Sequence, residues 1–516
     1  TADGKVNTKD VFTDKSGKKI AEYSYILESS ILKTLKTYYV YDDPGNMVYV
    51  LTPKLFTNLG SGTTISVTHL NDLAFQYKYD TYNRQIEQKV PGKKLWEYMV
   101  YDQLDRPILT QDENLKDDGK WLFTKYDAFG RAVYSGLFTN SSSRATLQTA
   151  VDSYISGNTN NLSNIESRTT SASSIGGVSI NYSNNAYPTT GLEVLTVNYF
   201  DDYTFTDTDK PTTPTLILDQ TVTTRTKGFS TASWTKTLGA STWSKSYTYY
   251  NDKGSVIYVY EKNHLGGYTQ NKSRLDFRGK VKASVTEHKK TGSSPPLVIK
   301  DYFTYDHVER PLSHTQSIGG DNNVVDDEIT FDDQSPTSDE TIDHEASVSI
   351  TLTPGFTAKP GFNASIETFD RELIAYNNYD ELGQLTSKKL GGEANQIIAN
   401  STGLQTVDYT YDIRGALKAV NDVDNIGSDL FAYELNYETG EGVNFSSSDE
   451  QFNGNISQMV WKSAHNNTKK SYIYNYDDLN RFTKASYGEG SGLTSNTSFF
   501  KAEVTGYDHN GNITGL

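Results

Sequence analysis

The sequence predicts an all-β protein that is built from tandem antiparallel β-hairpins. Three observations lead to this prediction: a Tyr-Asp turn motif recurs along the chain, neighbouring copies lie close together, and aromatic residues are abundant. The 516 residues include 37 Tyr, 21 Phe and 5 Trp, although hydrophobic residues make up only 35% of the chain. So many aromatic residues exclude a disordered polymer. A tyrosine ring with its polar tip suits a sheet whose faces are partly wet.

Charge and residue content exclude several classes of protein. The chain has 48 basic and 64 acidic residues, and its formal net charge of −16 argues against binding nucleic acid through a basic surface. The absence of cysteine excludes disulfides, thiol nucleophiles and cysteine-ligated metals, and it is compatible with secretion. No apolar run reaches the roughly 18 residues of a membrane-spanning helix. We therefore expect no nucleic-acid partner and no membrane span.

The Tyr-Asp dipeptide occurs nine times, and the residues that follow it define the repeat. Five copies continue with three residues and an arginine, and the other four place glycine at the fourth position of the turn. Residues 250–254 and 275–280 are degenerate copies, and residues 198–201 form a weaker one. The motif residues that we predict to build the repeat are Tyr41, Asp42, Gly45, Tyr79, Asp80, Arg84, Tyr101, Asp102, Arg106, Tyr126, Asp127, Gly130, Arg131, Tyr305, Asp306, Arg310, Tyr379, Asp380, Gly383, Tyr411, Asp412, Gly415, Tyr476, Asp477, Arg481, Tyr507, Asp508 and Gly511.

Each part of this motif has a physical role in a hairpin. Neighbouring copies at Tyr79, Tyr101 and Tyr126 are 22 and 25 residues apart, which fits two strands and two turns. Tyrosines two residues apart share one face of a strand and can form ladders with neighbouring strands. The Asp carboxylate can accept backbone N–H groups two residues on, and Gly or Asn follows where φ must be positive. We expect the Arg to pair with an acidic or aromatic neighbour in the adjacent hairpin.

On these residues the chain resembles the YD repeats of Rhs-type proteins. Residues 38–53 and 98–136 are especially similar to Rhs-repeat proteins of the Bacteroidota type, and copies of the motif cover 37–136, 247–312 and 374–516. The resemblance implies that the hairpins join edge to edge into one long antiparallel sheet that spirals into a hollow shell. A long sheet must twist and curl, and a spiral pairs most of its edges. An ordinary set of β-sandwich or propeller domains is the alternative.

Breaks in the repeat divide the chain into five segments. Two of them are insertions: one is rich in Ser, Thr and Asn, with a short helix expected over 145–155, and the other is acidic. We interpret the acidic segment as a solvated loop; a calcium site is the alternative, although the order of its acids matches no EF-hand loop. The final turn, 507–516, lacks a completed partner strand, so we expect sequence beyond both ends. The segments are 1–136 (repeat sheet), 137–196 (insertion), 197–316 (repeat sheet), 317–349 (acidic insertion) and 350–516 (repeat sheet).

The sequence contains none of the common catalytic, phosphate-binding or zinc-binding motifs. No two of the eight histidines form the helical zinc-protease motif, and neither a P-loop nor a Gly-x-Ser-x-Gly elbow occurs. The self-cleavage motif that often ends the shell in Rhs proteins is also missing. We therefore predict no catalytic, cofactor-binding or metal-binding residue, no cofactor, and no enzymatic activity.

The resemblance implies a non-catalytic shell segment of a large secreted or cell-surface bacterial protein that encapsulates, and delivers, a C-terminal toxin or effector. For Bacteroidota-type relatives it further implies type IX secretion and a role in competition between bacteria. The implied partners are the protein's own C-terminal effector domain, the outer-membrane secretion machinery and surface lipoproteins.

Two other functions remain open at this point. One is a cell-surface carbohydrate-binding or adhesin module in which exposed aromatic rings stack on sugars; core anchoring is the other interpretation of the same rings. The tryptophans that could do so are Trp96, Trp121, Trp234, Trp243 and Trp461. The other is a glycosidase on a β-propeller, since a ~22-residue period is half a blade.

Overall fold

The computed structural model describes residues 8–28, 31–60, 62, 64–158, 164–320, 326–331, 343–352, 363–366, 370–496, 499–508 and 511–516. The chain forms two compact units. The first comprises Thr1–Thr215, Thr221–Tyr268 and Lys290–Ser293, and the second comprises Leu216–Gln220, Thr269–Lys289 and Ser294–Leu516. Within the described residues, 27 strands belong to a single sheet. This confirms the predicted all-β fold of tandem hairpins in one long antiparallel sheet.

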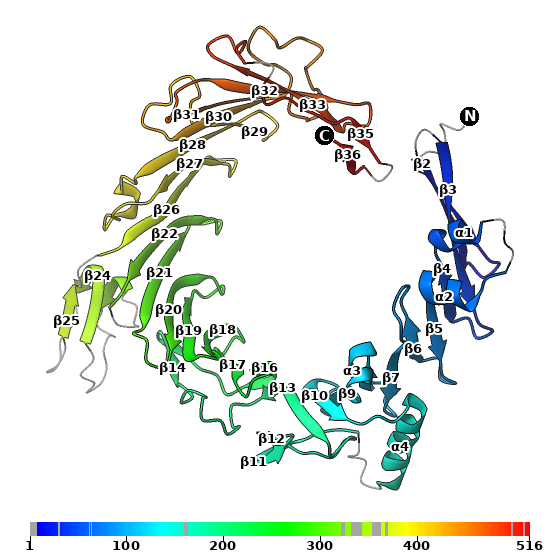
Figure 1. Ribbon diagram of the computed structural model, residues 1–516. Helices are drawn as coiled ribbons and strands as arrows, with labels where there is room; N and C mark the ends of the chain where they lie inside the picture. Colours follow the sequence, from blue (N-terminus) through cyan, green and yellow to red (C-terminus); the bar gives the residue numbers. More distant parts are fainter. Residues whose placement is uncertain are drawn as a thin grey trace. The chain divides into compact units, whose positions relative to one another are not determined.

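In the first unit, strands pair antiparallel in chain order, so that hairpin follows hairpin (Figure 1). After an insertion, the tenth strand pairs with a strand about fifty residues further on, and the order then continues. The strands are β1 (Lys9–Thr13), β2 (Lys19–Glu28), β3 (Ile31–Tyr41), β4 (Met47–Leu51), β5 (Ala74–Tyr79), β6 (Gln85–Lys89), β7 (Glu97–Tyr101), β8 (Pro107–Gln111), β9 (Lys120–Tyr126), β10 (Ala132–Thr139), β13 (Leu192–Asp201), β16 (Thr226–Lys236), β17 (Trp243–Tyr250) and β18 (Val256–Lys262).

The insertion between β10 and β13 holds helix α4 (Arg144–Gly157) and the two-stranded sheet of β11 (Arg168–Ile175) and β12 (Val178–Tyr182). Helix α4 covers the stretch 145–155 for which the sequence predicted a short helix. The Ser143 hydroxyl caps it by accepting from the Thr146 N–H. Gln148 ties the helix to β7, since its side-chain amide donates to the Tyr101 carbonyl (2.8 Å) and accepts from the Tyr101 N–H (3.0 Å).

Three further short helices were not predicted: α1 (Pro53–Leu59), α2 (Val67–Leu73) and α3 (Glu113–Asp117). Their first turns carry recognisable start signals, although Thr52 does not cap α1 with its side chain. Pro stands in the first turn of α1, Ser66 and His69 form a reciprocal capping box at α2, and Asp112 caps α3. Helix α1 buries Leu55 against β4 and β5. None of the helices in the described ranges is long and apolar enough to cross a membrane.

In the second unit, which takes most of β19 and β20, strands again pair in chain order. Two small pairs lie outside this series: β14 (Leu216–Ile217) with β15 (Gln220–Thr221), and β35 (Gly506–Tyr507) with β36 (Ile513–Gly515). The strands of the series are β19 (Gly266–Leu275), β20 (Val281–Thr291), β21 (Leu297–Tyr305), β22 (Pro311–Ile318), β26 (Glu372–Tyr379), β27 (Leu385–Leu390), β28 (Gln405–Tyr411), β29 (Leu417–Val420), β30 (Phe431–Asn436), β31 (Gln458–Ser463), β32 (Lys470–Tyr476), β33 (Phe482–Glu489) and β34 (Ala502–Glu503).

Between β22 and β26 lies a separate parallel sheet of β23 (Asp326–Phe331), β24 (Asp343–Leu352) and β25 (Asn363–Ile366). The repeat strands therefore resume at Glu372. The predicted alternative of a calcium site rests on acidic residues from Asp321 to Glu340. Their side chains are not among those that the structure describes.

Aromatic side chains form the interior of the first unit. Tyr134, Tyr199 and Trp234 are fully or almost fully buried. Tyr199 stacks on Phe205 with ring centroids 4.2 Å apart and planes 5° apart. The prediction of partly wet tyrosine faces is wrong for Tyr134 and Tyr199, because rings from β12, β16 and the loop after β13 cover them. The hydroxyls of Tyr134 and Tyr199 still find partners: the Tyr134 hydroxyl donates to the Ser183 carbonyl at 2.9 Å, and the Tyr199 hydroxyl accepts from the Asn181 N–H at 3.1 Å. The indole nitrogen of Trp234 is buried without a hydrogen-bond partner among the described residues.

Two of the five tryptophans agree with the core-anchoring interpretation and not with sugar stacking. Trp121 is 0% exposed and Trp234 is 2% exposed, so both are core anchors. Trp96, Trp243 and Trp461 are half-buried.

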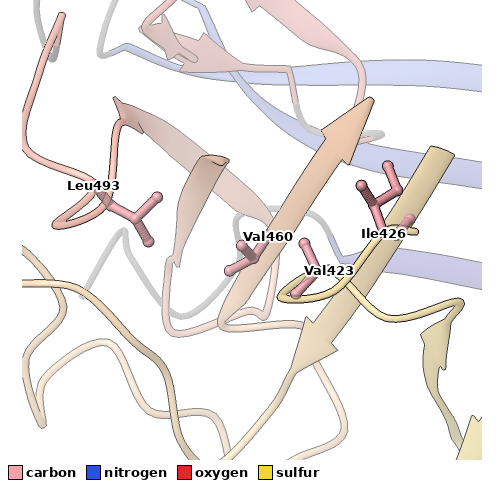
Figure 2. Close-up of a cluster of buried hydrophobic side chains, with 5 residues drawn as sticks. Val423, Ile426, Val460 and Leu493 are labelled. Carbon is pink, nitrogen blue, oxygen red and sulfur yellow. The ribbon is translucent and has the colours of Figure 1, made fainter. Parts of the chain in front are cut away.

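The apolar clusters of the second unit are small. One joins Val423, Ile426, Ala432, Val460 and Leu493, which come from β30, β31 and the loops beside them (Figure 2). Another contains only Ala283, Val285 and Val298, with two partly buried neighbours. Clusters of this size bury little area per strand. Contacts between successive hairpins therefore matter for holding this unit together.

Candidate functional site: the turn ladder

The 28 predicted motif residues form a series of equivalent turns, which we call the turn ladder. Every Tyr of the motif is the last residue of a strand, and every Asp opens the turn that follows it. The structure therefore places these residues at corresponding positions of successive hairpins. It does not gather them into one pocket.

The Asp carboxylate organises the turn from inside. In the copy at Asp80, Oδ1 accepts the N–H of Tyr82 (2.9 Å) and of Arg84 (3.0 Å), while the Asp80 N–H donates to the Arg84 carbonyl (3.0 Å). The bond from the N–H four residues on to Oδ1 is present in all nine copies. One side chain thus replaces the backbone partners that a tight turn leaves unsatisfied.

The fourth position of each turn has a positive φ. It is +93° at Gly45 and +77° at Gly130, and it stays positive where the residue is Asn83 (+63°), Asp105 (+58°) or Glu309 (+72°). Glycine adopts this conformation without strain, and Asn and Asp tolerate it better than other residues. Glu309 has neither advantage and is held by its neighbours, since its carboxylate contacts Arg278 and Lys280.

Where a turn has an arginine, that residue contacts the next hairpin. Arg84 Nε donates to Asp80 Oδ2 at 2.8 Å, and its guanidinium carbon lies 4.9 Å from the centre of the Tyr101 ring. Three further arginines lie over the motif tyrosine that follows: Arg106 over Tyr126 (4.7 Å), Arg310 over Tyr379 (4.4 Å) and Arg481 over Tyr507 (4.5 Å). A cation over a ring in this range is attracted by the ring's quadrupole.

The weak motif copy at 198–201 fits the same scheme with a shifted register. Arg131 lies 4.4 Å from the centre of the Phe200 ring, and it also pairs with Asp201 at 2.5 Å. Phe200 and not Tyr199 therefore stands where other copies have the motif tyrosine. Tyr199 points into the core instead.

The motif tyrosines make a second contact between hairpins, which sequence reasoning missed. Each hydroxyl donates to a backbone carbonyl of the preceding hairpin, on the residue directly after its arginine position. The hydroxyl–carbonyl pairs are Tyr41–Lys19 (2.8 Å), Tyr79–Met47 (3.0 Å), Tyr101–Gln85 (2.6 Å), Tyr126–Pro107 (2.9 Å), Tyr305–Val281 (2.9 Å), Tyr379–Pro311 (2.9 Å), Tyr411–Leu385 (3.1 Å), Tyr476–Ile456 (2.8 Å) and Tyr507–Phe482. No side-chain pattern reveals this contact, because the acceptor is backbone.

Two complete turns also escaped the sequence search. Asp14 accepts from the N–H groups of Ser16 (2.8 Å) and Lys18 (2.9 Å). Asn263 accepts from those of Leu265 (3.0 Å) and Gly267 (2.9 Å). Both lack the preceding tyrosine. An Asp or Asn followed three residues later by glycine is the signal that would have found them.

Burial and charge suit the ladder to a structural role. The Asp102 side chain is 2% exposed and its partner Arg106 is 15% exposed. Burial raises the pKa of Tyr101 and of Tyr126, which keeps both phenols protonated as donors. The hydrogen bond from Arg131 holds the pKa of Asp201 below its ordinary value, against the opposing effect of burial. Within the described ranges, no group of three or more His, Cys, Asp or Glu could hold a metal ion.

The chain can be compared with known families, curated proteins and solved structures. No protein-family model matches the chain, and no curated protein matches it. Similar solved structures include TcdB2–TccC3–Cdc42, with 14% identity over 96% of this chain and 20% of that chain and a TM-score of 0.29. TcdB2–TccC3–TEV has 12% identity over 99% of this chain and 20% of that chain, with a TM-score of 0.30. The Tc holotoxin pore of Photorhabdus luminescens with a mutated TccC3 has 13% identity over 96% of this chain and 19% of that chain, with a TM-score of 0.27. The chain spans about a fifth of the length of these structures.

Proposed function

We propose that the chain is a non-catalytic wall segment of a large secreted or cell-surface Rhs-repeat protein, and that the wall encloses a C-terminal toxin or effector. One observation carries this proposal: every motif tyrosine donates to a backbone carbonyl of the preceding hairpin, and in four copies the arginine of that hairpin also lies over the tyrosine ring. Each hairpin thereby prepares the docking place of its successor. A sheet built in this way can be extended without enlarging a central core.

The distribution of apolar side chains supports a wall. Among the described residues, the apolar clusters of the second unit are small, and most side chains of strands such as β26 and β27 are half-buried. Half-buried faces can lie against water or against an enclosed partner. A long sheet that twists also approaches its own edges, and edges that meet are protected from aggregation.

The proposed partners are the protein's own C-terminal effector, the outer-membrane secretion machinery and surface lipoproteins. The proposed location is the bacterial cell surface or the medium, reached through type IX secretion, with competition between bacteria as the purpose. These points rest on the sequence resemblance.

Limited proteolysis of the full-length protein that carries this chain tests the proposal. We expect the C-terminal domain to be digested far more slowly within the full-length protein than when it is expressed alone. An Asp102→Ala variant, which loosens one buried turn, should shorten that protection. Equal digestion rates for the enclosed and the isolated domain would refute encapsulation.

A carbohydrate-binding module is the second candidate, because one tryptophan stays accessible beside other rings. Trp461 is half-buried and stacks on Tyr472 with centroids 5.3 Å apart and planes 25° apart, and Tyr487 lies 6.2 Å from Trp461. Such a platform suits the apolar face of a sugar. Glycan-array binding that is lost in Trp461→Ala would support this function, and binding that survives the substitution would count against this platform.

A further inference from the structure

A buried cluster of three polar side chains joins the repeat sheet to the insertion of the first unit. Lys125 lies on β9, Glu166 precedes β11, and Asn184 follows β12. The Lys125 and Glu166 side chains are both 0% exposed. Lys125 Nζ lies 2.5 Å from Asn184 Oδ1 and 3.0 Å from Glu166 Oε1, and it also donates to the Ala186 carbonyl at 2.8 Å.

The surroundings make the ammonium form of Lys125 less stable than it is in water. Burial lowers the pKa of Lys125, although the neighbouring Glu166 opposes this effect. The Tyr134 ring covers the amine from 5.2 Å and is itself buried. A lysine that is desolvated among aromatic groups is activated as a nucleophile.

The carboxamide of Asn184 presents its carbonyl group to the amine of Lys125. Its Nδ2 donates to the Thr189 carbonyl at 2.8 Å, so Oδ1 is the atom that faces Lys125. The distance from Nζ to Oδ1 is shorter than the ~2.7–3.2 Å of an ordinary N–H···O hydrogen bond. With a C=O bond of ~1.2 Å, Cγ lies no more than about 3.7 Å from Nζ, close to the ~3–3.5 Å of a near-attack geometry. The Tyr134 hydroxyl donates to the Ser183 carbonyl (2.9 Å) and lies 3.5 Å from Oδ1, so it would have to turn to Oδ1 to stabilise negative charge that develops there.

Glu166 is held where it can carry a proton. Its Oε1 accepts from the Ala186 N–H (3.0 Å) as well as from Lys125. Its Oε2 accepts from the Ser183 hydroxyl (2.6 Å) and the Asn185 N–H (2.9 Å). These bonds fix the carboxylate beside the amine. A simple buried ion pair is the alternative, because an ammonium has three donors and Glu166, Asn184 and the Ala186 carbonyl supply three acceptors. The two states differ in whether a covalent bond joins Lys125 and Asn184.

We propose that Lys125 and Asn184 form an intramolecular isopeptide bond, with Glu166 as the catalytic proton carrier. The Lys125 ammonium first gives one proton to Glu166, and the free amine then attacks Cγ of Asn184 to form the new C–N bond. The Cγ–Nδ2 bond breaks, and the departing NH₂ group takes a second proton from Nζ and leaves as ammonia. The proton on Glu166 leaves with it as ammonium, so the carboxylate is regenerated. No oxidant, reductant or metal is consumed.

The bond would brace the first unit covalently in a chain without cysteine. It joins residues that are 59 positions apart and fastens the insertion to the repeat sheet. The inference does not depend on the proposed function, since it rests only on the geometry of this cluster.

Mass spectrometry of the purified folded chain tests the proposal. We expect an intact mass that is lower than the sequence mass by one ammonia, and a protease digest in which the peptide of Lys125 is joined to the peptide of Asn184. The variants Lys125→Arg, Asn184→Ala and Glu166→Gln should each lack the joined peptide. The matched control Asn185→Ala changes the neighbouring amide and should retain it.

Two outcomes would overturn the proposal. One is a folded wild-type chain with the full sequence mass and no joined peptide. The other is an ammonia loss that persists in Lys125→Arg without any joined peptide, which would indicate a succinimide at Asn184. Because the wild-type digest decides the question alone, a variant that fails to fold does not prevent the test.

Discussion

The buried turn at Asp102 offers the strongest test of the turn ladder, through the variant Asp102→Ala. This substitution removes the acceptor of the Leu104 N–H (2.9 Å) and the Arg106 N–H (3.0 Å). It also removes the partner of the Arg106 guanidinium at Nε (2.8 Å) and Nη2 (2.6 Å). Arg106 then stays in place as a cation with only 15% of its side chain exposed.

The size of the effect follows from this burial. Breaking a buried ion pair by removing one partner costs about 3–5 kcal/mol. Arg106 keeps the Asn164 carbonyl (2.6 Å) and the Tyr126 ring (4.7 Å), so we expect the lower end of that range. A cost of about 3 kcal/mol corresponds to roughly a hundredfold increase in the population of the open turn.

Hydrogen exchange is the suitable assay, because a chain of two units does not unfold as a single two-state system. The amides of residues 101–107 should exchange roughly a hundredfold faster in Asp102→Ala than in the wild type. The matched control Asp477→Ala removes the same contacts from a turn in which Asp477 is 26% and Arg481 is 31% exposed, and its effect should be smaller. Unchanged exchange at residues 101–107 in Asp102→Ala would refute the reasoning.

Three further predictions concern single contacts of the ladder. Tyr126→Phe removes the donor to the Pro107 carbonyl and should weaken local protection from hydrogen exchange by about 0.5–1.5 kcal/mol. Unchanged exchange would show that the Tyr126 hydroxyl does not stabilise the contact between hairpins. Gly130→Ala places a Cβ at φ +77° in open space, so strain alone should cost about 1–2 kcal/mol in the exchange of that turn, and Gly130→Asn should cost less. Because the pKa of Asp201 is lowered by Arg131, its contribution to stability is complete above the ordinary carboxyl pKa of ~3.9 and is lost as pH falls through the lower folded value. Thermal melting from pH 6 to 2 should therefore depend less on pH in Arg131→Met than in the wild type, and identical profiles would contradict this assignment.

The sequence was sufficient for the turn chemistry and for the all-β class. A Tyr-Asp turn is encoded within six residues, and short-range rules for Asp and Gly predict its geometry. The copies at Asp14 and Asn263 were missed because they lack the tyrosine on which the search relied. Their turns form nevertheless, since the acceptor and a glycine at the positive-φ position are sufficient.

Longer-range features could not be read from the sequence. Tyr199 and Tyr379 are both tyrosines of repeat strands, yet Tyr199 is fully buried and Tyr379 is half-buried. The difference arises from the insertion, which covers only part of the sheet. The cluster of Lys125, Glu166 and Asn184 was invisible for the same reason, because its members are brought together only by the tertiary fold.

The central proposal is that successive hairpins, each docked on the last by its tyrosine and in several copies also by an arginine, build a wall around an enclosed partner. Electron cryomicroscopy of the full-length protein tests this most directly. The account predicts a continuous wall of repeat strands with density for the C-terminal domain inside it. A C-terminal domain that lies outside the repeat sheet, in a particle without an interior space, would contradict the account.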